Sequence, residues 1–350
     1  MVEPFTGRVN CRPLLEEELP QYLHFAGEMW GPTAPQASET RVRWLYQFNP
    51  NTKGFSKDLF VGLVDNKIVG GAHRMRLPWR VHGERTIGSS GHDLGVLPAH
   101  QSGLGALLAL APEEGEEQVL HAGLSPTMDQ FYGRLKAHAI TCCWQRKALS
   151  YTRAAVQLFR GGRQTRASSL PALQFEQEFR LGELTFTSTS QPPDTLLERA
   201  VALKVSSASP QSYWVDWDKP AFAWRFFHPL GPRHVLILAS TSSEDVGRMV
   251  VSFGRRKRLR IARFVDAWAC DERFLPPLLQ AGERVMKALG ASAGFSVTSW
   301  QAAAETLSRQ AWSRYKAPPG VRLFRRKSKG ICEIVNLWGG AWDFGCDASE

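Results

Sequence analysis

Residues 89–110 have the sequence SSGHDLGVLPAHQSGLGALLAL, and this stretch decides the expected fold. The run up to Val96 predicts a strand, Pro98 marks a loop, and Gly103-Leu104-Gly105 opens an apolar helix. Glycines let a ligand approach the backbone closely, and the N–H groups at a helix start attract phosphate. No Gly-Lys-Ser/Thr follows, so the loop is not of the Walker type. The order of elements predicts a turn that binds pyrophosphate.

The elements around this turn predict an antiparallel sheet with helices. Two strands at 59–64 and 68–77 are joined by a turn at Asp65-Asn66, and a further turn at 81–85 leads to a third strand and then a fourth at 88–96. Helices are expected at 14–30, 41–48 and 126–137, and strands at 119–124 and 138–144. The same order of elements recurs between residues 196 and 311, although identity between the halves is low.

A change in composition separates the two halves. Residues 153–171 are rich in Arg, Gly, Gln and Ser, which indicates a linker or an exposed crossing segment. We therefore expect an α/β (α+β) protein with one domain over 1–152, a linker over 153–185 and a second domain over 186–350.

Bulk properties exclude several classes of protein. No run of about 18 uncharged apolar residues occurs, and the N-terminus lacks the apolar core of a secretory signal, so we expect a cytoplasmic protein without a membrane partner. The six cysteines lack metal-ligand spacing, so no metal site is expected. The formal net charge of +10 suits an anionic ligand such as coenzyme A, an acidic carrier protein or nucleic acid.

The turn resembles the signature of the GNAT superfamily of N-acetyltransferases, a strand ending in Val-x-Pro followed by Arg/Gln-x-x-Gly-x-Gly/Ala. Val96-Leu97-Pro98 matches the first part, and Gly103-x-Gly105 matches the last. Gln101 stands two residues before Gly103, so His100 occupies the strict first position and the loop is one residue short. The repeated element order is similar to that of bacterial tandem-domain members of the superfamily.

This resemblance implies two tandem domains, each a mixed, mainly antiparallel twisted sheet flanked by helices. It implies acetyl-CoA or another acyl-CoA as the donor, bound by Leu94, Val96, Gln101, Ser102, Gly103, Leu104, Gly105 and Ala106. The corresponding stretch of the second copy, 269–277, has no glycine and carries Asp271 and Glu272. Carboxylates repel phosphates, so one donor site is expected, in the first copy.

Candidate catalytic residues lie on both sides of this turn. The resemblance implies that Tyr132 is the general acid toward the departing thiolate, although the residue alone fits a core tyrosine equally well. Attack by an amine needs a general base, and His92 and Asp93 are candidates near the strand end. Strand alternation sends these two side chains to opposite faces, so at most one should reach the site.

Three further residues are candidates for acceptor contact: Trp30, Tyr46 and Glu84. The acceptor itself is left open among the amines of small molecules, sugars, peptides and carrier-bound intermediates. The leading hypothesis is an acyl-CoA-dependent N-acyltransferase acting by direct attack in a ternary complex. An aminoacyl-tRNA-dependent transferase of tandem plan and a non-catalytic scaffold with a degenerate fold remain as alternatives; nucleic acid is not expected as a partner under the leading hypothesis.

Overall fold

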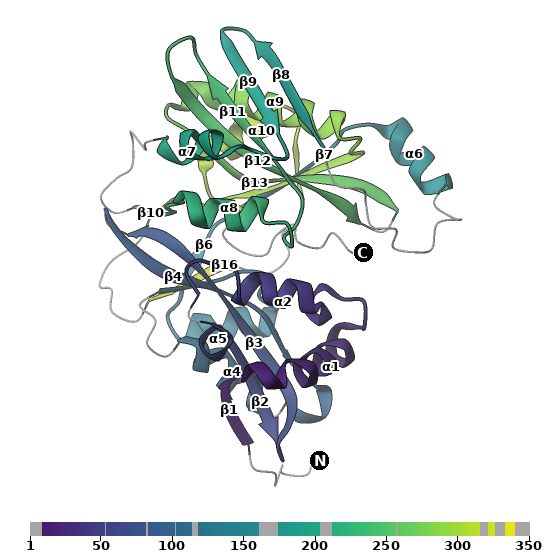
Figure 1. The fold of residues 1–350 in the computed structure, drawn as a ribbon, viewed down its shortest axis with the longest axis vertical. Helices are drawn as coiled ribbons and strands as arrows, with labels where there is room; N and C mark the ends of the chain where they lie inside the picture. The colour runs from purple at the N-terminus through teal and green to yellow at the C-terminus, as the bar shows by residue number, and fades with distance from the viewer. Residues whose placement is uncertain are drawn as a thin grey trace. The chain divides into compact units, whose positions relative to one another are not determined.

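The computed structural model describes residues 9–52, 54–81, 83–101, 103–113, 118–160, 174–203, 212–256, 258–315, 321–325 and 333–339. They form two compact units, each built on a sheet with flanking helices (Figure 1). Unit 1 comprises Met1–Leu77, Ile87–Ala139 and Pro319–Gly330, and unit 2 comprises Pro78–Thr86, Ile140–Pro318 and Ile331–Glu350. The predicted fold class, α/β with two mainly antiparallel sheets, is confirmed.

The sheet of unit 1 follows the order β1-β2-β3-β4-β5-β16-β6, in which β4 and β5 pair in parallel. Its strands are β1 (Val9–Pro13), β2 (Leu59–Val64), β3 (Lys67–Val81), β4 (Glu84–Val96), β5 (Gln118–His121), β6 (His138–Ile140) and β16 (Val321–Arg325). Its helices are α1 (Leu19–Trp30), α2 (Glu39–Tyr46), α3 (Phe55–Asp58), α4 (Leu104–Leu110) and α5 (Pro126–Arg134). The expected third and fourth strands form one strand, β4, and β1 was not predicted.

The sheet of unit 2 follows the order β15-β7-β14-β13-β12-β11-β9-β8. Its strands are β7 (Cys143–Ala148), β8 (Glu176–Leu181), β9 (Leu184–Thr189), β11 (His234–Ser240), β12 (Asp245–Arg256), β13 (Leu259–Ala269), β14 (Ala293–Thr298) and β15 (Ser313–Arg314). Two more strands, β10 (Ser212–Val215) and β17 (Glu333–Asn336), pair with each other, and β10 also pairs with the end of β3. The helices are α6 (Tyr151–Arg160), α7 (Asp194–Ala202), α8 (Lys219–Phe227), α9 (Leu275–Ala288) and α10 (Gln301–Arg309).

The two units exchange strands, so their bounds differ from the continuous ranges expected from the sequence. Strand β7 follows the first half of the chain but pairs with β14 of unit 2, whereas β16 follows the second half but pairs with β5 of unit 1. Arg322 of β16 holds Asp129 of α5 through two hydrogen bonds of 2.6 and 3.1 Å.

Parts of the expected linker form α6 and β8, and residues 161–173 lie outside the described residues. Among the described helices, none combines the length and apolar character needed to cross a bilayer.

A buried ion network fixes the start of β2 against β3. Asp58 is 1% exposed and its Oδ1 accepts hydrogen bonds from Arg76 Nε at 2.7 Å and Arg74 Nε at 3.2 Å. The two arginines are two residues apart, so they point to the same face of β3. Thr52 donates to the other carboxylate oxygen at 2.5 Å. Asp58 is therefore the anion that neutralises two buried guanidinium groups.

Replacing Asp58 with Asn should lower the free energy of unfolding by about 3 kcal/mol or more, because it leaves buried guanidinium charge without its counterion. Urea unfolding followed by circular dichroism measures this. The control is Glu39→Gln, which removes an exposed partner of Arg43 at 2.8 Å and should cost only about 0.5 kcal/mol. Equal losses for the two variants would contradict the argument.

Candidate functional site

The parallel pairing of β4 with β5 stops before β4 ends. Their parallel pairing joins Ser89 to Val119 and reaches only as far as Gly91 opposite His121, whereas β4 continues to Val96. At Gly91 a Cβ would lie 2.8 Å from Nδ1 of His121, so glycine is needed where that ring lies against the strand. Residues 92–96 of β4 thus present a backbone edge that β5 does not cover. Such an edge can pair with an extended ligand that carries amide groups.

The loop after β4 enters α4 with an open backbone. Gly103 caps α4 with a φ of 84°, a conformation that favours glycine, and a Cβ there would meet nothing within 4 Å. At Gly105 the nearest atom to an added Cβ is Val96 Cγ2 at 4.0 Å. Gln101 donates from Nε2 to the carbonyl of Val96 at 3.2 Å, which ties the loop to the strand end. An anionic group can therefore approach the first N–H groups of α4. Ser102 lies outside the described residues.

Helix α4 rests on two glycines of the sheet. A Cβ at Gly62 of β2 would lie 2.8 Å from Leu104, and one at Gly70 of β3 would lie 2.6 Å from Leu108. Leu104 and Val96, both predicted to bind the donor, turn their side chains into the core beside α4. Only their backbone atoms can therefore meet a ligand.

Asp93 interrupts the alternation of side chains along β4. Its φ of 49° lies in the left-handed region, which Asp tolerates better than most residues. The expectation that His92 and Asp93 point to opposite faces is therefore wrong, since His92 Nε2 lies 3.9 Å from Asp93 Oδ2. With His73 of β3 they form a cluster whose ligating atoms all lie within 4.8 Å of one another. The irregular backbone thus gathers both candidate bases in one place.

Asp93 is a carboxylate held by two residues that lie between β1 and β2 in sequence. Arg41 of α2 donates to its Oδ2 at 2.6 Å, and Gln36 donates to its Oδ1 at 2.9 Å. Burial alone would raise the pKa of Asp93, but the Arg41 guanidinium, followed by the two histidine rings, lowers it well below its usual value. The carboxyl group is therefore ionised at neutral pH. It is a poor proton acceptor and a good orienting anion.

The ring of His92 is held by a backbone carbonyl. Its Nδ1 lies 3.3 Å from the carbonyl oxygen of Ser90 and donates to it, which in the neutral ring leaves the lone pair on Nε2. Nε2 is the atom nearest the Asp93 carboxylate. That charge stabilises the cation which the ring becomes when it accepts a proton.

His73 lies between two buried tyrosines. Tyr46 Oη is 2.6 Å from His73 Nδ1, and the hydroxyl of Tyr22 is hydrogen bonded to Nε2 of the same ring. Burial raises the pKa of both tyrosines well above the usual value, so both hydroxyls keep their protons. Because both nitrogens of His73 face hydroxyls, the cluster with His92 and Asp93 is arranged for hydrogen bonding rather than as an open set of metal ligands. Tyr46, expected to contact the acceptor, is 1% exposed and belongs to this network.

Tyr132 of α5 stands where β4 and β5 separate. Its ring stacks on His121, the last residue of β5, with 3.9 Å between centroids and 23° between planes. Its hydroxyl donates to the carbonyl of Ala109 in α4 at 3.4 Å. Tyr132 therefore connects α5, α4 and the end of β5, next to the uncovered edge of β4.

The two remaining acceptor candidates lie in different places. Trp30, at the end of α1, packs on Gly95 of β4, where a Cβ would lie 2.5 Å from its Cζ2. Trp30 therefore lies against the uncovered part of β4. Glu84 opens β4 nine residues before Asp93 and falls in unit 2, about 30 Å away along an extended strand. The structure does not bring Glu84 to the cluster.

Unit 2 also has a parallel strand pair in which one strand is longer, but different residues lie beyond the end of the pairing. The described parallel pairing of β13 with β14 ends at Phe264 opposite Ser296, and β13 continues to Ala269. Trp268 of β13 and Trp300, which follows β14, have ring centroids 6.1 Å apart. Asp271 caps the next turn through the N–H of Arg273. Aromatic rings and a carboxylate therefore stand where unit 1 has an uncovered edge and glycines.

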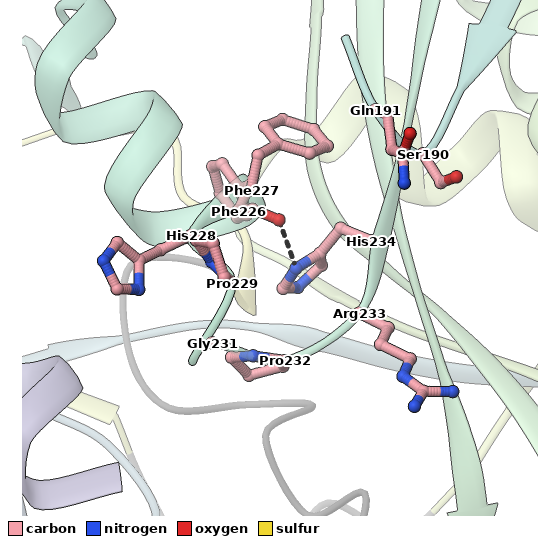
Figure 2. A pocket seen from close by; sticks show the side chains of 10 residues that line it. All are labelled: Ser190, Gln191, Phe226, Phe227, His228, Pro229, Gly231, Pro232, Arg233 and His234. Carbon is pink, nitrogen blue, oxygen red and sulfur yellow. Dashed lines mark hydrogen bonds between the residues drawn. The ribbon is translucent and has the colours of Figure 1, made fainter. Parts of the chain in front are cut away.

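Unit 2 also contains a pocket of about 460 Å³ at the end of α8 (Figure 2). It is lined by Ser190, Gln191, Phe226, Phe227, His228, Pro229, Gly231, Pro232, Arg233 and His234. His234 Nδ1 hydrogen bonds to the carbonyl of Phe226 at 2.9 Å. Burial, followed by the charge of Arg225, lowers the pKa of His234 to about 3. This ring is neutral at physiological pH and holds the pocket wall together.

Sequence reasoning missed Gln36, Arg41, His73 and His121. Arg41 and His73 sit in stretches that were expected only as a helix and a strand. A charged residue within an apolar strand is a signal of a buried partner, and His73 within β3 carried that signal.

Replacing His234 with Gln should flatten the fall of stability in acid. The folded pKa of about 3 lies below an unfolded value of about 6.5, so between these values the unfolded chain binds more protons and stability falls as pH falls. The slope due to this group is up to about 1.4 kcal/mol per pH unit. Denaturant unfolding between pH 4 and pH 7, values chosen within roughly this window, measures the difference from wild type. The exposed His138→Gln variant is the control, and an unchanged slope in H234Q would contradict the assignment.

Comparison with known proteins finds a likeness in the fold alone. No protein-family model matches the sequence, and no curated protein matches it. A structure of Saccharomyces cerevisiae N-myristoyltransferase with bound myristoyl-CoA is similar with a TM-score of 0.59 and 11% identity, over 94% of this chain and 85% of that one.

Two bacterial structures are similar to nearly the same extent. A GCN5-related N-acetyltransferase from Anabaena variabilis has a TM-score of 0.55 and 12% identity, over 90% of this chain and 72% of that one. A GCN5-related N-acetyltransferase from Kribbella flavida has a TM-score of 0.53 and 13% identity, over 91% and 71%. Identities this low establish the architecture only. The chain has the fold shared by GCN5-related N-acetyltransferases and N-myristoyltransferase.

Proposed function

We propose that this protein is an acyl-CoA-dependent N-acyltransferase with a single donor site in unit 1. The observation that carries the proposal is the uncovered edge of β4, residues 92–96, which carries His92 and Asp93 of the cluster and leads into the open glycine loop. The similar structures include N-acetyltransferases and an N-myristoyltransferase that holds myristoyl-CoA. Acetyl-CoA is the proposed donor.

The residues of unit 1 fit the parts of an acyl-CoA molecule. The loop at Gly103 and Gly105 offers N–H groups and no side chain that would block a pyrophosphate. The edge of β4 offers backbone groups to the amides of the pantetheine arm. Bound in this way, the donor supplies an activated acyl group next to His92. Leu94, Gln101 and Ala106 complete the proposed contacts.

The side chains of unit 1 would then divide the proton transfers. His92 Nε2 accepts the proton of the attacking amine, while the ionised Asp93 stabilises the ring as it becomes charged. The nitrogen bonds to the acyl carbon as the C–S bond breaks, and Tyr132 supplies a proton to the coenzyme A thiolate that leaves the acyl group. The acceptor is an amine of a small molecule, a sugar, a peptide or a carrier-bound intermediate, and Trp30 is the proposed acceptor contact.

Gly103→Asp should weaken binding of acetyl-CoA by about tenfold or more, because it puts a carboxylate beside the pyrophosphate. Isothermal titration with acetyl-CoA and with desulfo-CoA measures the affinity. Gly182→Asp is the matched control, since Gly182 also has a positive φ of 60° with nothing near an added Cβ and lies in the β8–β9 turn of unit 2. Both variants carry similar backbone strain, so only a lost phosphate contact separates them. Absence of binding to the wild-type chain at millimolar donor would overturn the proposal.

His92→Gln should lower turnover about 10²–10⁴-fold while leaving donor affinity unchanged, because it removes the base and not the phosphate contacts. Release of free coenzyme A in the presence of a panel of amines, including polyamines, aminoglycosides and peptides, gives the rate. His24→Gln, on the exposed side of α1, is the control.

Tyr132→Phe keeps the stacking on His121 and should lower the rate without lowering stability greatly. Unchanged rates in both site variants would contradict these two roles. Absence of turnover in the wild-type chain would favour a binding protein with this fold, and co-purified RNA would favour the aminoacyl-tRNA-dependent alternative.

A further inference from the structure

Helix α6 of unit 2 turns its apolar side toward solvent. Tyr151 and Phe159 are 80% and 88% exposed, and Val156 and Leu158 are exposed as well. Tyr151, Ala155 and Phe159 follow one another at intervals of four residues, so they lie on one side of the helix, with Leu158 beside them. We call these four residues the outer stripe. Amphipathic helices of globular proteins normally bury such a side.

The inward side of α6 is polar and its contacts explain how the helix is held. Arg153 donates to the carbonyl of Lys287 at 2.6 Å. Gln157 accepts a hydrogen bond from the N–H of Arg260 at 2.9 Å and donates to the carbonyl of Gly290 at 3.5 Å. The helix is therefore fixed to unit 2 through polar groups, while Tyr151 and Phe159 remain largely exposed. Figure 1 shows α6 at the periphery of unit 2.

Basic residues accompany the outer stripe. Arg153 and Arg160 belong to α6 itself. The turn between β12 and β13 adds the run Arg255-Arg256-Lys257-Arg258. Arg258 Nη1 lies 3.4 Å from the carbonyl of Leu158, which places this basic turn directly beside the helix.

We propose that α6 and the β12–β13 turn form a surface that binds an anionic phospholipid bilayer. The outer stripe enters the boundary between headgroups and acyl chains, and the neighbouring arginines remain at the level of the lipid phosphates. This combination of exposed apolar residues on one side and basic residues beside them is what interfacial helices need. Nucleic acid would use the charges but not the aliphatic side chains Val156 and Leu158, so lipid explains more of the surface.

This inference changes one sequence expectation. The expectation of no membrane partner rested on the lack of a spanning segment, and a spanning segment is not needed for binding at the bilayer surface. The inference does not depend on the proposed enzymatic function, because α6 lies outside the unit that carries the donor site.

Sedimentation of the full chain with phosphatidylcholine vesicles, with and without about one third phosphatidylglycerol, tests the proposal. The wild-type chain should sediment with anionic vesicles and much less with neutral ones. The double variant Tyr151→Ser/Phe159→Ser should bind the anionic vesicles about tenfold or more weakly. Arg255→Gln/Arg258→Gln should weaken binding by about fivefold or more, and this difference should shrink in high salt. The control Phe48→Ser/Leu230→Ser removes two other exposed apolar residues, 43% and 41% exposed, and should bind like wild type.

Three results would overturn the proposal. The first is sedimentation of the Tyr151→Ser/Phe159→Ser variant equal to that of wild type. The second is equal binding of the wild-type chain to neutral and anionic vesicles. The third is a dimer in solution, seen by light scattering, that the same double variant converts to monomer, because the outer stripe would then be covered by a second copy of the chain.

Discussion

The described pairing of β4 with β5 stops at Gly91 and His121, and the geometry of unit 1 follows from that point. Beyond it, β4 continues through the irregular Asp93 to Val96, while β5 ends and the chain leads on to α5. The uncovered edge of β4, the glycine loop and Tyr132 all adjoin this separation. A continuous parallel pair would have covered the backbone groups of residues 92–96 with hydrogen bonds to β5, and no amide-containing ligand could have reached them.

The separation is stabilised by a charge that comes from outside the sheet. A left-handed Asp93 costs about 1 kcal/mol or more, and this conformation persists only if its surroundings favour it. Arg41 and Gln36 provide that support by holding both carboxylate oxygens. The same contacts tie the segment before α2 and α2 itself to β4. The strand irregularity, the ionised carboxylate and the position of His92 are therefore one structural feature.

This feature also explains where sequence reasoning succeeded and where it stopped. Strand, proline, glycine and apolar helix are local signals, and β4, its loop and α4 form as the residues 89–110 predict. The direction of Asp93 depends on Arg41, which is 52 residues earlier, so alternation within β4 gave the wrong face. The exchange of β7 and β16 between the units depends on pairing over still longer separations, and no local pattern encodes it.

The second unit shows that one backbone plan can carry different side chains at the same step. Both units separate a parallel strand pair at the same step of the element order, and in each unit the longer strand continues past the last described pair. In unit 2, Trp268 and Trp300 face each other beyond the separation, and large aromatic surfaces there bury apolar area that would otherwise be exposed. Packing sets the arrangement of the strands. A few side chains on those strands determine a site, since a fold does not by itself carry a function. Four positions mark the difference: glycines stand at 103 and 105 in unit 1, and tryptophans stand at 268 and 300 in unit 2.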